Sequence, residues 1–271
     1  MSKRKIFTLT AASLFILAFA GLVFVYRQDI RDAKARFSRG RIPTAVTRND
    51  IIRIENTAPE TNAVVKKIEP AQPLTPSPSK ALPKEMNLRV PFVLQAPFKI
   101  WDEIHEDACE EASVLMLQAY VKGEKSLTLD EMDARILGMV DFQIANYGDY
   151  KSTDVEATAK IMRDHLKLER VVVLPIATAN DIRTQIAKGR PVVIPAAGRL
   201  LFNPNFRHGG PLYHMLVVKG YTADGNFVTN DPGTRLGADY IYAEDVLMNA
   251  IHDYNGGDVL NGKKMMIVIA E

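Results

Sequence analysis

Cys109, the single cysteine of the chain, lies at the start of a stretch that predicts a helix. The stretch "CEEASVLMLQAYVKG" is apolar-rich and ends at Gly123, and glycine commonly terminates helices. Backbone N–H groups are unpaired at a helix N-terminus and the local dipole is positive, so this position stabilises a thiolate. Glu110 and Glu111 follow directly, and as anions they oppose thiolate formation. Cys109 is therefore either a buried small hydrophobe or a nucleophile that needs a partner base.

His214 is the partner base that the sequence favours. It opens the apolar strand "HMLVVKGY", which the Asp-Gly turn signal of "TADGN" connects to the returning segment "FVTNDPGT". Asp231 ends that segment and comes within a few residues of His214, although a longer loop or a bulge is needed to bring the two level. A carboxylate beside a histidine orients the imidazole and stabilises its cation. Asn230 is the alternative orienting residue, because neighbouring strand residues point to opposite faces.

Two other residues near Cys109 have side chains suited to chemistry. Gln95, in "VLQAPF", can supply an amide that binds a developing oxyanion together with the Cys109 N–H, or it is simply a loop residue. His105 precedes Cys109 by four residues, so it is a second candidate base. The two residues are also a weak candidate metal pair, because they lack a third ligand. We expect no cofactor and no metal.

The elements that must position these residues form an α+β pattern. Helices are predicted first, over 109–123, 128–140, 153–167 and 180–189, with capping boxes from Thr128 to Glu131 and from Thr153 to Glu156. Strands are predicted at 88–94, 171–175, 191–196, 214–221, 227–230 and 264–270. This order predicts a helical lobe packed on a mostly antiparallel sheet.

The N-terminal third differs from the rest of the chain. Residues 6–26 carry no charge, follow the basic "MSKRK" and are long enough to cross a bilayer. We therefore expect a membrane anchor at 1–27, a Pro-rich disordered linker at 28–85 and a folded domain at 86–271. A signal peptide cleaved after Ala20 is the alternative to the anchor.

The charge pattern bears on location and partners. Lys and Arg residues after the apolar run favour a cytoplasmic domain, whereas a spacer-like linker is most useful outside the cell. We expect a single-pass membrane protein whose folded domain is extracytoplasmic. The net charge of +2 is too small to indicate a nucleic-acid partner.

Four segments resemble the leader-peptidase-like cysteine peptidases of the papain clan, which include bacteriocin-processing and double-glycine peptidases. They are "VPFVLQAPF", "DACEEASVLML", "GRPVVIPAAGR" and "YHMLVVKGYTADGNFVTNDPGT", and the similarity covers roughly residues 88–245. The resemblance implies a papain-like fold in which Cys109 is the nucleophile, His214 the base, Asp231 the orienting residue and Gln95 the oxyanion donor. It implies hydrolysis of peptide bonds in a peptide or protein substrate.

The residues leave two other functions open. One is a non-catalytic papain-like domain that binds peptides or cell-wall material, and the other is a hydrolase of the same clan that cleaves peptidoglycan amide bonds. The turn-rich segment "FNPNFRHGGPLY" (202–213) is either a flap over a substrate groove, with Gly209-Gly210 as its hinge, or an ordinary surface loop.

Overall fold

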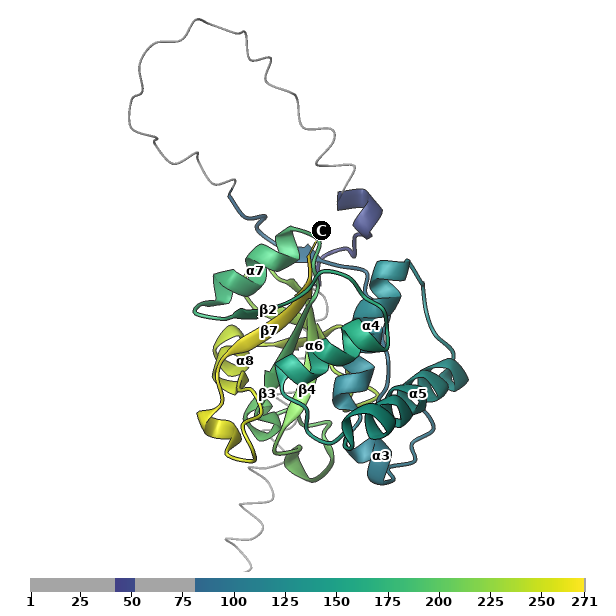
Figure 1. Ribbon diagram of the computed structural model, residues 1–271. Helices are drawn as coiled ribbons and strands as arrows, with labels where there is room; N and C mark the ends of the chain where they lie inside the picture. The colour runs from purple at the N-terminus through teal and green to yellow at the C-terminus, as the bar shows by residue number, and fades with distance from the viewer. Residues whose placement is uncertain (1–41, 52–80, 271) are drawn as a thin grey trace, which may run out of the picture. The chain divides into compact units, whose positions relative to one another are not determined.

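A computed structural model describes residues 42–51 and 81–270 (Figure 1). The strands of the described part are β1 (Met86–Asn87), β2 (Val171–Pro175), β3 (Val192–Ala196), β4 (His214–Tyr221), β5 (Phe227–Asn230), β6 (Tyr240–Tyr242) and β7 (Met265–Ile269). The α-helices are α3 (Glu103–Glu106), α4 (Cys109–Lys122), α5 (Leu129–Tyr147), α6 (Val155–Asp164), α7 (Ala179–Ala187) and α8 (Glu244–Ala250). Three short 3₁₀ helices are η1 (Gly198–Leu201), η2 (Arg207–Gly209) and η3 (Val259–Asn261).

The strands form one antiparallel sheet in the order β2-β7-β3-β4-β5-β6, with β1 paired to β4. Every residue of β3, β4 and β5 is buried, so these strands form the middle of the core. Their apolar, β-branched composition suits strands that are covered on both faces. The antiparallel sheet that the sequence predicts is therefore present.

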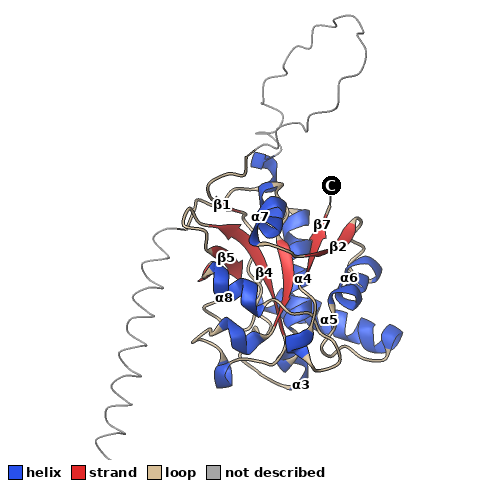
Figure 2. Cartoon of the chain, turned by 90° about the vertical axis from the view of Figure 1, so that its left-hand side faces the viewer, coloured by secondary structure: helices blue, strands red, loops and turns tan. Residues whose placement is uncertain are grey.

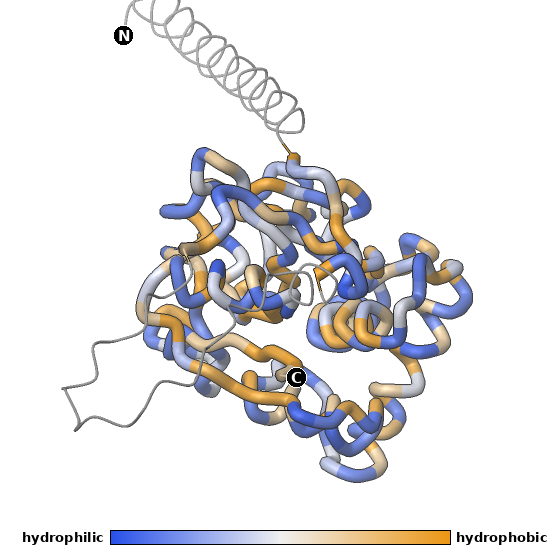
Figure 3. The backbone as a smooth tube through the Cα atoms, turned by 90° about the horizontal axis from the view of Figure 1, so that it is seen from above, coloured by the Kyte–Doolittle hydropathy of each residue, from blue (hydrophilic) through white to orange (hydrophobic). Residues whose placement is uncertain are grey.

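Helices cover both faces of the sheet. In Figures 1 and 2, α4, α5 and α6 lie on one side of the strands, and α7 and α8 lie on the other. The central helix α4 packs against β4, and its residues from Cys109 to Tyr120 are all buried. Figure 3 shows two long hydrophobic runs that lie side by side near the C-terminus, and mostly hydrophilic residues along the protruding loops. The N-terminus of α4 is thereby fixed beside the end of β4 where His214 lies.

Local sequence signals predict several element boundaries correctly. Helix α4 ends at Gly123, which has a φ of 71°. Helix α5 begins with the predicted capping box of Thr128 and Glu131. Strands β2, β4 and β5 have the predicted bounds. These features depend on neighbours three or four residues away or on simple alternation, so the sequence alone reveals them.

Other local predictions are wrong. The helix predicted over 128–140 continues to Tyr147, and the helix predicted over 153–167 ends at Asp164. Helix α6 is capped by Asp154, whose side chain accepts a hydrogen bond from the Ala157 N–H, and Thr153 instead contacts the side chain of Thr158. Residues 88–94 do not form a strand, because Pro91 has no N–H to donate. Their carbonyl groups are used elsewhere, since the Asn230 side chain donates to the carbonyls of Val90 and Pro91.

The predicted anchor at residues 6–26 and most of the predicted linker lie outside the described residues. Within 42–51 and 81–270, no helix is both long and apolar enough to span a bilayer. Residues 43–51 differ from the linker prediction, because they pack on the domain. Val46 forms a parallel bridge with Leu88, and Ile51 is buried in the core. Two apolar residues, Val46 and Ile51, in an otherwise mostly polar segment give no sequence signal of such docking.

Candidate active site

Cys109 is the first residue of α4 and is buried, with 4% of its surface exposed. Its Sγ donates a hydrogen bond to Oε2 of Glu110 at 2.9 Å. Burial, followed by the charge of Glu110, raises the pKa of the thiol well above its usual range, and the backbone N–H of Met215 opposes this shift. The thiol is thus held between the first turn of α4 and the start of β4.

His214 and Asp231 form the hydrogen bond that the sequence predicts. Nε2 of His214 lies 2.9 Å from Oδ1 of Asp231, and both side chains are almost completely buried. The connection from β4 to β5 uses the long loop at 222–226 and a shift of register between Val218 and Gly220. The shifted register places Asp231 one residue beyond the Val217–Asn230 pair, from where its side chain reaches the His214 ring. Asn230 does not contact His214, because its side chain binds Val90, Pro91 and Asp239.

Two further residues hold Asp231 in place, and the sequence analysis missed both. The Tyr242 hydroxyl donates to Oδ2 of Asp231 at 2.6 Å and accepts a hydrogen bond from the Asn203 side chain at 2.8 Å. Burial and the Asp231 charge raise the pKa of Tyr242 well above its usual range. The Gly233 N–H donates to Oδ1 of Asp231. Only the pairing of β6 with β5 brings Tyr242 to the site, so no local sequence pattern predicts its position there.

The Gln95 side chain lies close to the segment before Cys109. Its amide Nε2 donates to the carbonyl of His105 at 2.9 Å and lies 3.3 Å from the carbonyl of Glu106. Its Oε1 is buried without a hydrogen-bond partner among the described residues. Gln95 therefore supports the chain that leads into α4, and in this conformation its amide hydrogens point to backbone carbonyls.

Glu110 and Glu111 are both buried at the helix start, with 1% of each residue exposed. Oε1 of Glu110 accepts from the Thr153 N–H at 3.0 Å, and Oε1 of Glu111 accepts from the Gln143 amide at 2.5 Å. Burial, then the charge of Glu111, raises the pKa of Glu110 to about 8. Burial raises the pKa of Glu111 to about 7. At neutral pH the pair therefore holds a proton that exposed glutamates would release.

The segment 202–213 contacts the site through Phe206 and Arg207. Arg207 donates to Oε1 of Glu106 at 2.7 Å, and its guanidinium lies 5.0 Å from the Trp101 ring centroid. The Phe206 ring contacts the His214 ring edge-on, with 5.3 Å between centroids. We call Arg207, Glu106 and Trp101 the clasp. Among the hydrogen bonds of the described residues, none joins Sγ of Cys109 to the ring of His214.

The His105 ring is hydrogen-bonded to two carboxyl groups and not to the thiol. Nδ1 lies 2.7 Å from Asp102 and Nε2 lies 3.0 Å from Asp133, so the ring links α3 to α5. Within the described residues, no cluster of three or more His, Cys, Asp or Glu side chains is arranged to hold a metal ion.

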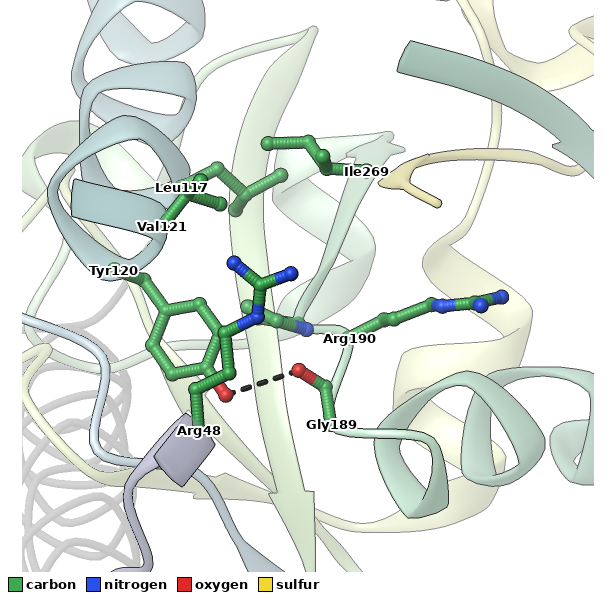
Figure 4. A pocket seen from close by; sticks show the side chains of 8 residues that line it. Arg48, Leu117, Tyr120, Val121, Gly189, Arg190 and Ile269 are labelled. Atoms are coloured by element: carbon green, nitrogen blue, oxygen red, sulfur yellow. Dashed lines mark hydrogen bonds between the residues drawn. The ribbon is translucent and has the colours of Figure 1, made fainter. Parts of the chain in front are cut away.

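Figure 4 shows a pocket at the other end of α4. Arg48, Tyr120 and Arg190 are among its lining residues, and the Tyr120 hydroxyl donates to the carbonyl of Gly189. It lies more than two helical turns from Cys109 and shares no residue with the Cys109 site.

Comparison with known families identifies the domain. Residues 87–256 match the model of the Peptidase_C39 like family, which is more than half of the chain. The chain belongs to this family. It is a family of cysteine peptidases, so membership agrees with the resemblance noted from the sequence. No curated protein matches the chain.

Two solved structures are similar to this member of the family. A protein from Bacillus anthracis described as a C39-like peptidase is 15% identical, with a TM-score of 0.46, over 71% of this chain and 98% of the other. A fragment of prointerpain A from Prevotella intermedia is 13% identical, with a TM-score of 0.33, over 55% of this chain and 43% of the other.

Proposed function

We propose that this C39-like domain is a cysteine peptidase that hydrolyses peptide bonds with Cys109, His214, Asp231 and Gln95. The observation that carries the proposal is the buried hydrogen bond between His214 and Asp231. The residue after His214 is Met215, and its backbone N–H faces the Cys109 sulfur. Asp231 takes Nε2 of the imidazole, so Nδ1 is the nitrogen left to accept the thiol proton. This division of roles is that of a nucleophile, a base and an orienting acid.

The reaction follows from these positions. The Cys109 proton passes to Nδ1 of His214, and the thiolate attacks the carbonyl carbon of the scissile amide. The Cys109 N–H at the start of α4 stabilises the oxyanion, with Gln95 as the second donor. His214 then gives its proton to the leaving amine, and water releases the acyl group from sulfur.

A thiol-directed activity probe and a peptide-library cleavage profile test this proposal. Cys109→Ala and His214→Ala should each abolish hydrolysis, and Cys109→Ala should also abolish labelling, because the chain has no other cysteine. His252→Ala is the matched control, since that ring contacts the Gly262 carbonyl. Hydrolysis that persists in Cys109→Ala contradicts the proposal.

The second experiment concerns Gln95. If Gln95 is an oxyanion donor, Gln95→Ala lowers turnover roughly a hundred- to a thousand-fold and leaves alkylation of Cys109 nearly unchanged. Its hydrogen bonds to His105 and Glu106 suggest a second role, in shaping the chain before α4. A parallel loss of turnover and alkylation in Gln95→Ala would assign it only that role.

A non-catalytic peptide-binding domain is the second candidate, and one observation favours it. The thiol donates to Glu110, and no hydrogen bond among the described residues joins it to His214. Binding of library peptides with equal affinity by the wild type and Cys109→Ala, without cleavage by either, would support this candidate. Cleavage of peptidoglycan stem peptides in place of library peptides would assign the same residues to a cell-wall hydrolase.

We also propose that residues 1–27 anchor the protein in a membrane and that the domain lies outside the cytoplasm. The uncharged run at 6–26 supports the anchor. Cell fractionation should find the full chain with membranes and a version lacking residues 1–27 in the soluble fraction. Protease added outside spheroplasts should degrade the domain of the full chain, and protection from it would contradict the orientation.

A further inference from the structure

The Glu110 carboxyl lies directly against the reacting sulfur. Oε2 is 2.9 Å from Sγ of Cys109, whereas Oε1 accepts a hydrogen bond from the Thr153 N–H at 3.0 Å. A backbone N–H can only donate, so Oε1 is an acceptor whether the carboxyl is neutral or ionised. A proton on this carboxyl is therefore on Oε2, where it faces the sulfur.

The surroundings of this carboxyl favour the neutral form. Glu110 is 1% exposed, and its bonded partners are the thiol and one amide. The titratable groups that interact with the carboxyl, or with its partners, come from α4, the turn before it, the start of β4 and the segment after α8: Cys109, Glu111, Asp107, Tyr213 and, bound to Tyr213, Asp253. All of these groups are acidic and add no positive charge, and the remaining titratable group of the site, His214, is hydrogen-bonded to Asp231 and not to Glu110.

We propose that Glu110 is a positioning residue for the nucleophile, and that its protonation state controls how much Cys109 thiolate is available for attack. With Glu110 neutral, its O–H donates to sulfur, and the thiol proton moves to Nδ1 of His214. The resulting thiolate then has two donors, Glu110 and the Met215 N–H. Glu110 keeps its own proton throughout, so no further reactant is needed.

With Glu110 ionised, the contact has the opposite effect. The carboxylate accepts a hydrogen bond from the thiol S–H, and its charge opposes a second negative charge on the sulfur at that distance. Since burial and Glu111 raise the pKa of Glu110 to about 8, the donor is present below this pH and is lost above it. Reactivity of Cys109 should therefore decline as the pH rises through about 8. This inference rests on the proposed role of Cys109 as nucleophile.

The test is the pH dependence of Cys109 alkylation by iodoacetamide, which reports on one site because the chain has one cysteine. Glu110→Gln keeps an acceptor for the Thr153 N–H and an N–H donor for sulfur, but it cannot ionise. The ratio of its alkylation rate to that of the wild type should rise up to about tenfold between one unit below and one unit above the Glu110 pKa. A ratio that stays constant across this range overturns the proposal.

Glu111→Gln is the matched variant, because Glu111 is equally buried but contacts Gln143 and not the sulfur. The charge of Glu111 raises the pKa of Glu110, so removing it should move the decline in reactivity to lower pH. Circular dichroism shows whether Glu110→Gln folds. If it does not, the pH dependence of alkylation in the wild type and in Glu111→Gln still tests the proposal. No decline in the wild type, or a decline that is unmoved in Glu111→Gln, overturns the proposal.

The outcomes separate this inference from the proposed function. If alkylation shows the expected pH dependence but no peptide is hydrolysed, the peptidase function is rejected. The role of Glu110 is supported in that case. If hydrolysis requires Cys109 but alkylation of Glu110→Gln still declines with rising pH, the peptidase function is supported. The decline is then assigned to a group other than Glu110.

Discussion

At the scale of single residues, the buried carboxyls of Glu110 and Glu111 are the most unusual feature of the site. A buried carboxyl without a cation prefers its neutral form, and the raised pKa values of about 8 and about 7 express this preference. In the unfolded chain both groups ionise near their ordinary pKa of 4.5. The folded state thus binds protons that the unfolded chain releases.

This difference predicts how stability depends on pH. The free energy of unfolding should fall as the pH rises from about 4.5 to about 8, because the folded state binds more protons across that window. Glu110→Gln should flatten the fall, since its side chain is neutral in both states. Urea unfolding at several pH values measures this, and an equally steep fall in Glu110→Gln would contradict it.

Tyr242 offers a second prediction at this scale. Tyr242→Phe removes the donor to Oδ2 of the buried Asp231 carboxylate, which should cost about 1–3 kcal/mol of stability. Turnover should fall as well, because Asp231 then holds His214 less firmly. Tyr147→Phe is the control, since its hydroxyl binds the half-exposed Asp164 at the surface. Equal losses of stability in the two variants would count against a special role for Tyr242.

At the scale of elements, the segment 202–213 contacts both His214 and the residues that precede α4. The clasp joins this segment to residues 101–106, next to the start of α4. Both ends of its ion pair are about half exposed, so the pair itself contributes little to stability. Its position matters more than its strength, because it connects the segment that contacts His214 to the residues just before Cys109.

The clasp predicts the behaviour of Arg207→Ala. This variant should be alkylated at Cys109 several-fold faster than the wild type, with only a small change in melting temperature. Lys160→Ala removes an equally exposed ion pair, with Asp164 on α6, and should leave alkylation unchanged. Unchanged alkylation in Arg207→Ala would mean that the clasp does not limit access.

At the scale of the whole molecule, residues 43–51 belong to the folded domain. Ile51 is 6% exposed, and it packs close to Gly189 at the end of α7. Ile51→Ala should therefore cost about 2–5 kcal/mol of stability. Ile100→Ala, at a 61% exposed position, should cost far less, and denaturant unfolding compares the two. Equal costs would show that the segment is not part of the core.

Much of the fold and part of the site could be predicted from the sequence, because they depend on local patterns. Alternating and continuous apolar runs revealed the strands β2, β4 and β5, and Gly123 revealed the end of α4. The Asp-Gly turn showed that Asp231 returns beside His214, and their hydrogen bond is present. These features depend on residues that are close in sequence or joined by one hairpin.

The tertiary structure alone decided the environment of the nucleophile. The sequence could place Glu110 at a helix start, where a glutamate normally faces solvent, but not beneath Thr153, 43 positions away. It likewise could not connect Arg207 to Glu106, which are 101 positions apart. Burial and hydrogen-bond partners depend on which distant segments pack together. The protonation of Glu110, and with it the reactivity of Cys109, therefore depends on the folded structure and not on the local sequence.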